Sequence, residues 1–237
     1  MEETIRIYHG SEKIIKQPIF GEGRKNNDFG LGFYCTESDA LAKEWAVSSL
    51  QDGFSNCYTL DTKHLKVLNL NSSDYTILNW IAVLVEHRLF SVKIPVAARA
   101  KRFLIDNFSI NVNVFDLIIG YRADDSYFDY AESFINNGIT VEQLAYAMRL
   151  GRLGEQIVVK SQYAFSKLKY QSFEQASKDE YYILKKARND EANRMYMEML
   201  ENESEGLYIQ DIIRGGISND DPRIPRNISS QGPDSIG

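Results

Sequence analysis

Short apolar runs alternate with longer segments of helical periodicity along most of the chain. The short runs are rich in β-branched and aromatic residues and stop at glycine or polar residues, which is typical of strands. We predict strands at residues 5–8, 32–35, 56–60, 66–70, 115–119 and 156–159, and an extended segment at 169–173. We predict helices at residues 74–90, 99–107, 126–136 and 140–150, and one that begins near residue 36. This mixture predicts an α+β domain.

Two stretches depart from this pattern. Residues 21–32 hold four glycines, two asparagines and an aspartate, which predicts a loop. From about Glu174 a charged helix with a thin apolar stripe is predicted up to Asn202. After Gly215 the chain is rich in Ser, Asn, Asp, Gly and Pro, so we expect a tail that is mobile or ordered only against a partner. We therefore divide the chain into a domain of residues 1–172 and a C-terminal helical extension with a tail, residues 173–237.

The composition narrows the range of partners and compartments. The net charge is −6 over 237 residues, and no basic patch favours general DNA or RNA binding. Cys35 and Cys57 lack the spacing of metal ligands and cannot build a disulfide framework, so we expect two small apolar residues in strands and no metal. The acidic N-terminus does not resemble a signal peptide, and no apolar run is long enough to span a membrane. The expected compartment is the cytoplasm.

Three local patterns carry the candidate chemistry. They are Tyr-His-Gly-Ser at 8–11, Asp-Phe-Gly-Leu-Gly-Phe-Tyr-Cys-Thr at 28–36, and Gly-Glu-Gln-Ile-Val-Val at 154–159. Each alone is common in ordinary strands and turns. In this order and spacing they resemble the His-Tyr-Glu fingerprint of the diphtheria-toxin and poly-ADP-ribose-polymerase class of ADP-ribosyltransferases, with matches at His9, Tyr34 and Glu155.

A longer resemblance covers most of residues 5–170. Segments 115–128 and 150–156 are similar to a bacterial family of largely uncharacterised proteins that is assigned to the ADP-ribosyltransferase superfamily. That family is often associated with toxin–antitoxin loci, mobile elements or phage defence. The resemblance implies an ADP-ribosyltransferase-like split β-sheet core with flanking helices and NAD as the substrate. It also implies a macromolecular acceptor, protein or nucleic acid, and a small antitoxin or neutralising protein as a partner.

The resemblance also implies roles for the motif residues. His9 would bond a ribose hydroxyl as a neutral imidazole, and Tyr34 would stack on nicotinamide. Gly10 would approach the nicotinamide carboxamide through its backbone, because it has no side chain. The loop at 21–32 would close over the dinucleotide as a lid. The further cofactor-binding candidates are Ser11, Phe29 and Gly30.

Glu155 and Gln156 compete for the catalytic position. Neighbouring strand residues point to opposite faces, so only one of the two can face NAD. A Glu-x-Ile-Val template selects Glu155, which we favour, and the carboxylate would stabilise an oxocarbenium-like centre as in glycoside hydrolysis. The Gln-Ile start of the similar family selects Gln156, and the site would then lack a carboxylate base at this position.

A polar cluster of Arg122, Asp124 and Asp125 follows a predicted buried strand, where functional loops often lie. These residues either cap the next helix through ion pairs or recognise the acceptor. The function that we expect is mono-ADP-ribosyl transfer from NAD, in a toxin or phage-defence effector. The alternatives are an NAD glycohydrolase, with water as the acceptor, and a degenerate module that binds NAD or another protein.

Overall fold

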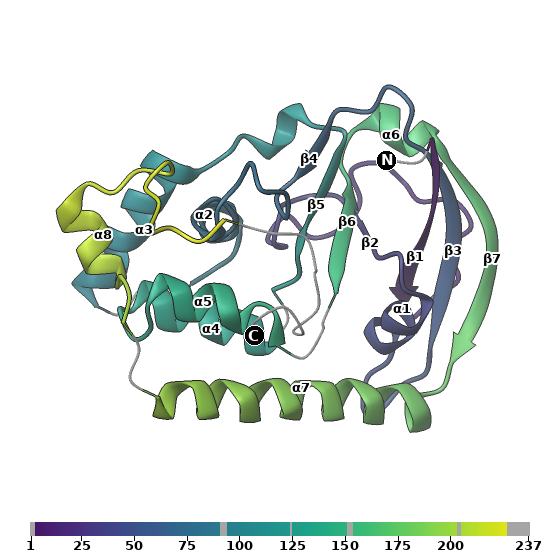
Figure 1. Ribbon diagram of the computed structural model, residues 1–237. Coiled ribbons are helices and arrows are strands. Elements are labelled where there is room, and N and C mark those ends of the chain that lie inside the picture. The colour runs from purple at the N-terminus through teal and green to yellow at the C-terminus, as the bar shows by residue number, and fades with distance from the viewer. Residues whose placement is uncertain (1–2, 91–93, 124, 151–153, 203–204, 227–237) are drawn as a thin grey trace.

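The computed structural model describes residues 3–90, 94–123, 125–150, 154–202 and 205–226. In these residues the strands form two sheets, with the orders β1-β3-β7 and β2-β6-β5-β4 (Figure 1). The strands are β1 (Thr4–Ser11), β2 (Phe33–Cys35), β3 (Gly53–Asp61), β4 (Val67–Asn69), β5 (Leu117–Tyr121), β6 (Glu155–Val159) and β7 (Leu168–Ala176). Only β4 and β5 pair in parallel among these strands.

Helices flank both sheets. They are α1 (Asp39–Ala46), α2 (Ile77–His87), α3 (Pro95–Phe108), α4 (Asp125–Ile135), α5 (Val141–Ala147), α6 (Gln162–Ser166), α7 (Lys178–Glu201) and α8 (Ile209–Gly215), with a short 3-10 turn η1 (Val112–Val114). Helix α1 packs on β1 and β3, whereas α2, α3, α4, α5 and α8 gather beside the four-stranded sheet (Figure 1). The predicted α+β class, with two sheets, flanking helices and a C-terminal helix, is confirmed.

Between the described residues of the two sheets, main-chain hydrogen bonds form at one residue pair, Tyr8 and Thr36. The Tyr8 amide donates to the Thr36 carbonyl at 2.8 Å, and the Thr36 amide donates to the Tyr8 carbonyl at 2.9 Å. Beyond this bridge, β1 and β2 belong to different sheets. Because Thr36 is used in the bridge, α1 begins later than the sequence suggested, and Ser38 caps it by accepting from the Leu41 amide.

The strands of the four-stranded sheet are buried on both faces, which explains their nearly continuous apolar sequences. One face lies between the two sheets and carries Phe33, Cys35 and Ile157. The other face packs against the helices and carries Ile118 and Val158. Both cysteines are buried in strands and unpaired, as predicted.

The C-terminal extension is packed against the rest of the molecule as far as the structure describes it. Strand β7 pairs with β3 along its length, so the boundary expected after residue 172 falls within a strand. Helix α7 runs beneath both the α1 side and the α4–α5 side of the molecule (Figure 1). Ile217 and Ile224 are buried in the main core, whereas residues 227–237 of the expected tail lie outside the described residues.

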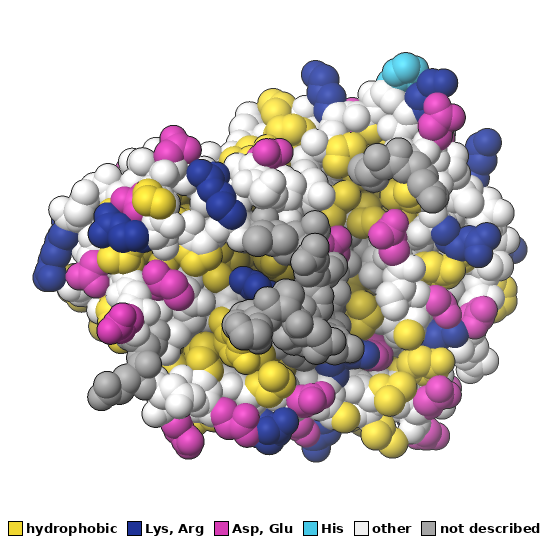
Figure 2. All heavy atoms as spheres, viewed as in Figure 1, with side chains coloured by type: hydrophobic (Ala, Val, Ile, Leu, Met, Phe, Trp, Pro, Cys, Tyr) yellow, Lys and Arg dark blue, Asp and Glu magenta, His cyan; other side chains and the backbone are white. Residues whose placement is uncertain are grey.

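The described surface visible in Figure 2 has no large patch of positive charge, in agreement with the sequence. Figure 2 shows Lys and Arg side chains interspersed with Asp and Glu side chains over the visible face. Within the described ranges, none of the helices combines the length and apolar character that a bilayer crossing requires.

Candidate functional site

The fold brings the three sequence motifs together on neighbouring strands. Strand β1 carries the first motif, β2 the second and β6 the third; β1 meets β2 at the Tyr8–Thr36 bridge, and β2 pairs antiparallel with β6. His9 Nδ1 lies 2.7 Å from the main-chain oxygen of Tyr34. The junction of the two sheets is therefore the candidate site.

His9 is held on the face that lies between the sheets. Its ring stacks on Phe33 with the centroids 4.3 Å apart. Burial lowers the pKa of His9 below its usual value, so the imidazole is neutral at pH 7. Because Nδ1 faces a carbonyl oxygen, it carries the proton, and Nε2 is left as a hydrogen-bond acceptor.

Tyr34 points to the opposite face of β2. Its position pairs with Val158, and its hydroxyl donates to the Gly30 carbonyl at 2.6 Å and accepts from the Phe29 amide at 3.1 Å. Burial raises the pKa of this phenol far above its usual value. The His9 and Tyr34 rings therefore do not converge on one ligand surface as the sequence analysis expected, because Phe33 and Tyr34 alternate across the strand.

Gly10 and Ser11 have structural partners that the sequence did not indicate. A Cβ atom at Gly10 would lie 2.1 Å from the Ala42 carbonyl oxygen, so the missing side chain allows α1 to pack closely on β1. Ser11 Oγ accepts from the Lys13 amide at 3.1 Å and shapes the turn after the strand.

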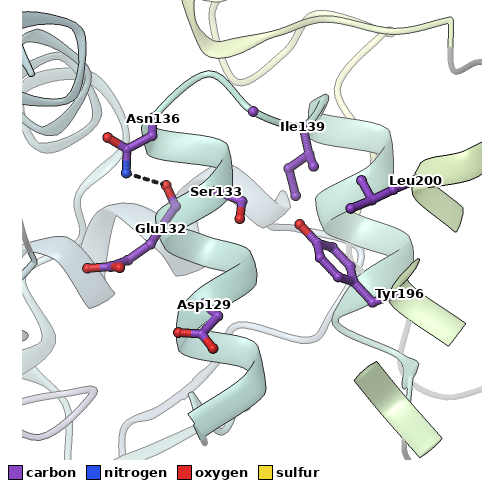
Figure 3. Close-up of a pocket in the computed structure, with 8 residues that line it drawn as sticks. Asp129, Glu132, Ser133, Asn136, Ile139, Tyr196 and Leu200 are labelled. Atoms are coloured by element: carbon purple, nitrogen blue, oxygen red, sulfur yellow. Dashed lines mark hydrogen bonds between the residues drawn. The ribbon is translucent and has the colours of Figure 1, made fainter. Parts of the chain in front are cut away.

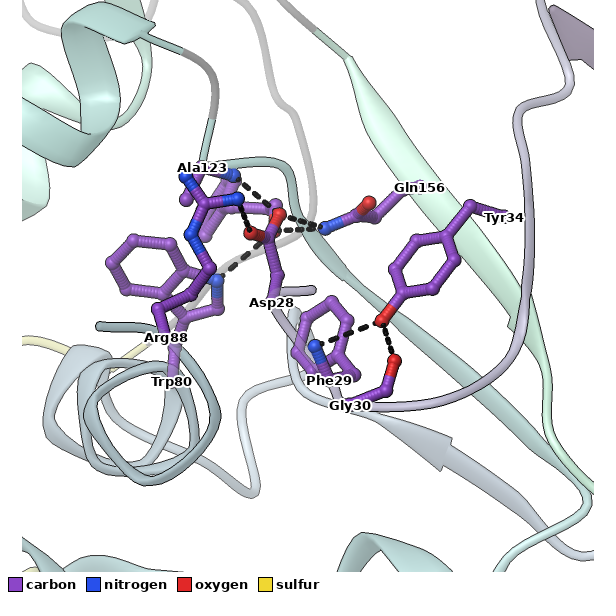
Figure 4. A network of polar contacts seen from close by, with 9 residues as sticks. Asp28, Phe29, Gly30, Tyr34, Trp80, Arg88, Ala123 and Gln156 are labelled. Atoms are coloured by element: carbon purple, nitrogen blue, oxygen red, sulfur yellow. Dashed lines mark hydrogen bonds and ion pairs between the residues drawn. The ribbon is translucent and has the colours of Figure 1, made fainter. Parts of the chain in front are cut away.

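A buried polar network surrounds Asp28 on the Tyr34 face (Figure 4). Asp28 Oδ2 accepts from Gln156 Nε2 at 2.8 Å and from the Ala123 amide at 2.9 Å, and Oδ1 lies 3.3 Å from Arg88 Nη1. Burial raises the pKa of Asp28, against the opposing effect of these partners. Gln156 Nε2 also donates to the Tyr121 carbonyl at 3.1 Å, so both of its amide hydrogens are used.

This network anchors the second half of the predicted lid. Phe29 is fully buried with its ring against Gly120, and Lys160 Nζ donates to the Phe29 carbonyl at 2.7 Å. Gly30 adopts a φ of +73° where a Cβ atom would collide with the His87 ring. Residues 21–26 are exposed, so only the first half of the loop has the freedom expected of a lid.

Glu155 is the first residue of β6 and lies on the face that also carries Ile157. Its side chain is half-buried, and Oε1 accepts from Asn71 Nδ2 at 2.9 Å. Gln156, and not the favoured Glu155, therefore shares a face with Tyr34, whereas Glu155 shares the inter-sheet face with Phe33. The sequence did not indicate Asn71, which lies beyond β4.

The polar cluster after β5 is described in part. The Arg122 guanidinium lies over the Trp45 ring of α1, 4.3 Å from its centroid, and so connects the end of β5 to the other side of the junction. Asp124 and the side chain of Asp125 lie outside the described residues. Nothing in the sequence indicated this contact.

A groove elsewhere on the molecule contains none of the motif residues. It has a volume of about 470 Å³ between α4 and α7, with Asp129, Glu132 and Tyr196 in its wall (Figure 3). Within the part of the chain that the structure describes, no group of three or more His, Cys, Asp or Glu side chains could hold a metal ion.

Comparison with protein families matches residues 5–170 to the family described as "Protein of unknown function (DUF3990)". The chain belongs to this family. The DUF3990 match includes all three motifs and ends within β7, so α7 and α8 lie beyond it. Comparisons with curated proteins and with solved structures give no match. The family description names no activity, and the function must be argued from the residues.

Proposed function

We propose that the protein binds NAD at the junction of the two sheets and transfers its ADP-ribose unit to a macromolecular acceptor. The observation that carries this proposal is the meeting of three motifs, far apart in sequence, on the adjacent strands β1, β2 and β6. Their order and spacing resemble ADP-ribosyltransferases, and β1 and β2 are edge strands of their two sheets.

His9 has the protonation state that this role needs. A neutral imidazole with Nδ1 held by the Tyr34 carbonyl presents Nε2 as an acceptor, which matches a ribose hydroxyl donor. The stacking on Phe33 fixes the plane of the ring, and a flip within that plane would lose the Tyr34 carbonyl as the partner of Nδ1, so Nε2 points in one direction.

Glu155 is the better candidate than Gln156 for the reacting end of NAD. Gln156 is buried and uses both amide hydrogens within the protein, whereas Glu155 is half-buried at the strand end. Glu155 lies three positions along β6 from Val158, the partner of Tyr34, which is about 10 Å. His9 and Glu155 could thus contact different parts of one extended dinucleotide.

The chemistry follows from a carboxylate near the nicotinamide ribose. The bond between C1′ and the nicotinamide nitrogen breaks, and nicotinamide leaves with the bonding electrons. The carboxylate stabilises the positive charge that develops on the ribose. The acceptor then bonds to C1′ and its proton moves to Glu155. We propose an effector of the toxin or phage-defence type, which a neutralising protein would hold inactive.

Labelled NAD, with and without cell lysate, tests this function. We expect the full chain to label macromolecules in lysate, and Glu155→Gln to reduce transfer at least about 100-fold while still binding NAD. His9→Ala should instead weaken NAD binding. Glu191→Gln, an exposed change on α7, is the matched control and should leave transfer unchanged.

Other outcomes separate the alternatives. Free ADP-ribose and nicotinamide without lysate would identify a glycohydrolase, and NAD binding without turnover would identify a binding module. Full transfer activity in Glu155→Gln, or no binding of NAD by the wild-type chain, would refute the proposed site.

A further inference from the structure

A second cavity lies on the outer face of the three-stranded sheet. It has a volume of about 200 Å³ and lies beside α1, across β1, β3 and β7. Tyr8 lines it, and Tyr8 precedes His9 on β1, so the cavity and the His9 ring are on opposite faces of the sheet. Next to it, a β-bulge between Cys57 and Tyr58 adds Gln171 to the wall. This site is therefore separate from the proposed NAD site.

One end of the cavity has an excess of negative charge. Asp39 and Glu174 lie there, and both bind Lys43 Nζ at 2.6 Å. One ammonium balances one of the two carboxylates, so a net charge of about −1 remains. Each carboxylate has several acceptor positions, and a single lysine leaves some of them available.

The other end carries a positive charge. Arg6 lines the cavity and is two positions before Tyr8 on β1. Among the described residues, Arg6 forms no ion pair and is exposed. A guanidinium presents several N–H donors in a planar fork that matches a carboxylate.

The wall between the two ends is neutral and forms hydrogen bonds. It contains the hydroxyls of Tyr8, Ser55 and Ser172 and the thiol of Cys57. Ser55 Oγ donates to Asp39 Oδ1 at 2.6 Å. Burial raises the pKa of the Cys57 thiol, so it adds no charge. A concave site with polar walls favours a polar ligand, because an apolar one would leave these groups without partners.

We propose that this cavity binds a small zwitterion, a free amino acid, with its carboxylate on Arg6 and its ammonium group at Asp39 and Glu174. The separated charges of the wall complement the separated charges of such a molecule. At about 30 Å³ for each water-sized group, 200 Å³ holds about six or seven such groups, which suits a small amino acid. A dinucleotide is far too large to fit.

Thermal unfolding of the full chain tests this site with defined probes. The probes are glycine, alanine, serine and glycylglycine, each compared with its N-acetyl and methyl ester forms, which lack one of the two charges. At ten times the dissociation constant, a bound zwitterion should raise Tm by about 3 to 5 °C. The singly charged forms should give no shift. Glycylglycine has more non-hydrogen atoms than this volume holds, so it should give a smaller shift than alanine or serine.

Two variants and a control connect the shift to the cavity. Arg6→Gln should abolish it and Glu174→Gln should reduce it at least about tenfold in affinity, whereas Arg102→Gln, an exposed change on α3, should leave it intact. Arg6 and Glu174 are exposed, and the Tm of each variant without ligand shows that it folds. The proposal is overturned by equal shifts with the singly charged forms, by an unchanged shift in Arg6→Gln, or by no shift with any probe. None of these results bears on NAD transfer.

Discussion

Removing Arg188 should detach α7 from α1 and destabilise the whole molecule. Arg188 Nη2 lies 2.8 Å from Glu44 Oε1, and Arg188 Nε lies 3.1 Å from Glu44 Oε2. The Glu44 side chain is 4% exposed, so Arg188→Ala leaves a buried carboxylate without its bidentate partner. Breaking a buried pair in this way costs about 3–5 kcal/mol. Since the Arg188 side chain is 29% exposed, water can enter from its side, and we expect the lower end, about 3 kcal/mol.

The assay is denaturant unfolding, with thermal unfolding as a second readout. A loss of about 3 kcal/mol corresponds to a fall in Tm of about 6–12 °C for a chain of this size. Lys186→Ala, an exposed change on the same helix, is the control and should alter the free energy of unfolding by less than about 0.5 kcal/mol. Adding Glu44→Gln to Arg188→Ala should restore most of the loss, because it removes the buried charge. A loss below about 1 kcal/mol in Arg188→Ala would refute the reasoning.

Two further predictions concern the first motif. Gly10→Ala should lower the free energy of unfolding by about 3 kcal/mol, because its Cβ atom would lie 2.1 Å from the Ala42 carbonyl oxygen. Gly21→Ala is the control: it lies in open space at a φ of +87° and should cost about 1 kcal/mol. Equal losses in the two variants would contradict this packing argument. Burial lowers the pKa of His9 in the folded state, so the unfolded chain binds more protons than the folded one below about pH 6.5. The free energy of unfolding should therefore decrease as the pH is lowered below this value. His9→Gln should flatten this pH dependence, which urea unfolding across about pH 5–8 measures.

Periodicity predicted most of the elements, α8 excepted, but not their ends. The apolar spacing around Trp80 and Leu84 predicted the buried helix α2. The runs at 115–119 and 156–159 predicted two strands, which the structure pairs as β5 and β6. Helix starts depend on which polar side chain is free to cap. Thr36 is a good cap by residue type, but it is used in the bridge between the sheets, and Ser38 takes its place. Such competition is not visible in local sequence.

The sequence indicated which strands carry the candidate site, but not to which face of the sheet each side chain points. His9, Tyr34 and Glu155 lie on the neighbouring strands β1, β2 and β6. The Asp28 network was missed because its partners come from separate parts of the chain: Arg88 follows α2, Ala123 follows β5, and Gln156 lies on β6. One signal was present, since Asp28 opens the second motif. The sequence does not show that Asp28 is buried, because its burial arises only when these separate segments pack together.

The choice between Glu155 and Gln156 shows why direction matters for mechanism. A shift of one residue in β6 exchanges a carboxylate for an amide at the same place, so the register of β2 against β6 determines which group faces a ligand. The register puts Gln156 under the loop, where its amide hydrogens hold Asp28 and the Tyr121 carbonyl. Gln156→Ala should then loosen residues 28–30 and weaken activity through the loop, whereas Glu155→Gln should affect the chemical step alone. Strand alternation thus gives Gln156 a structural role and leaves Glu155 as the residue for the proposed chemistry.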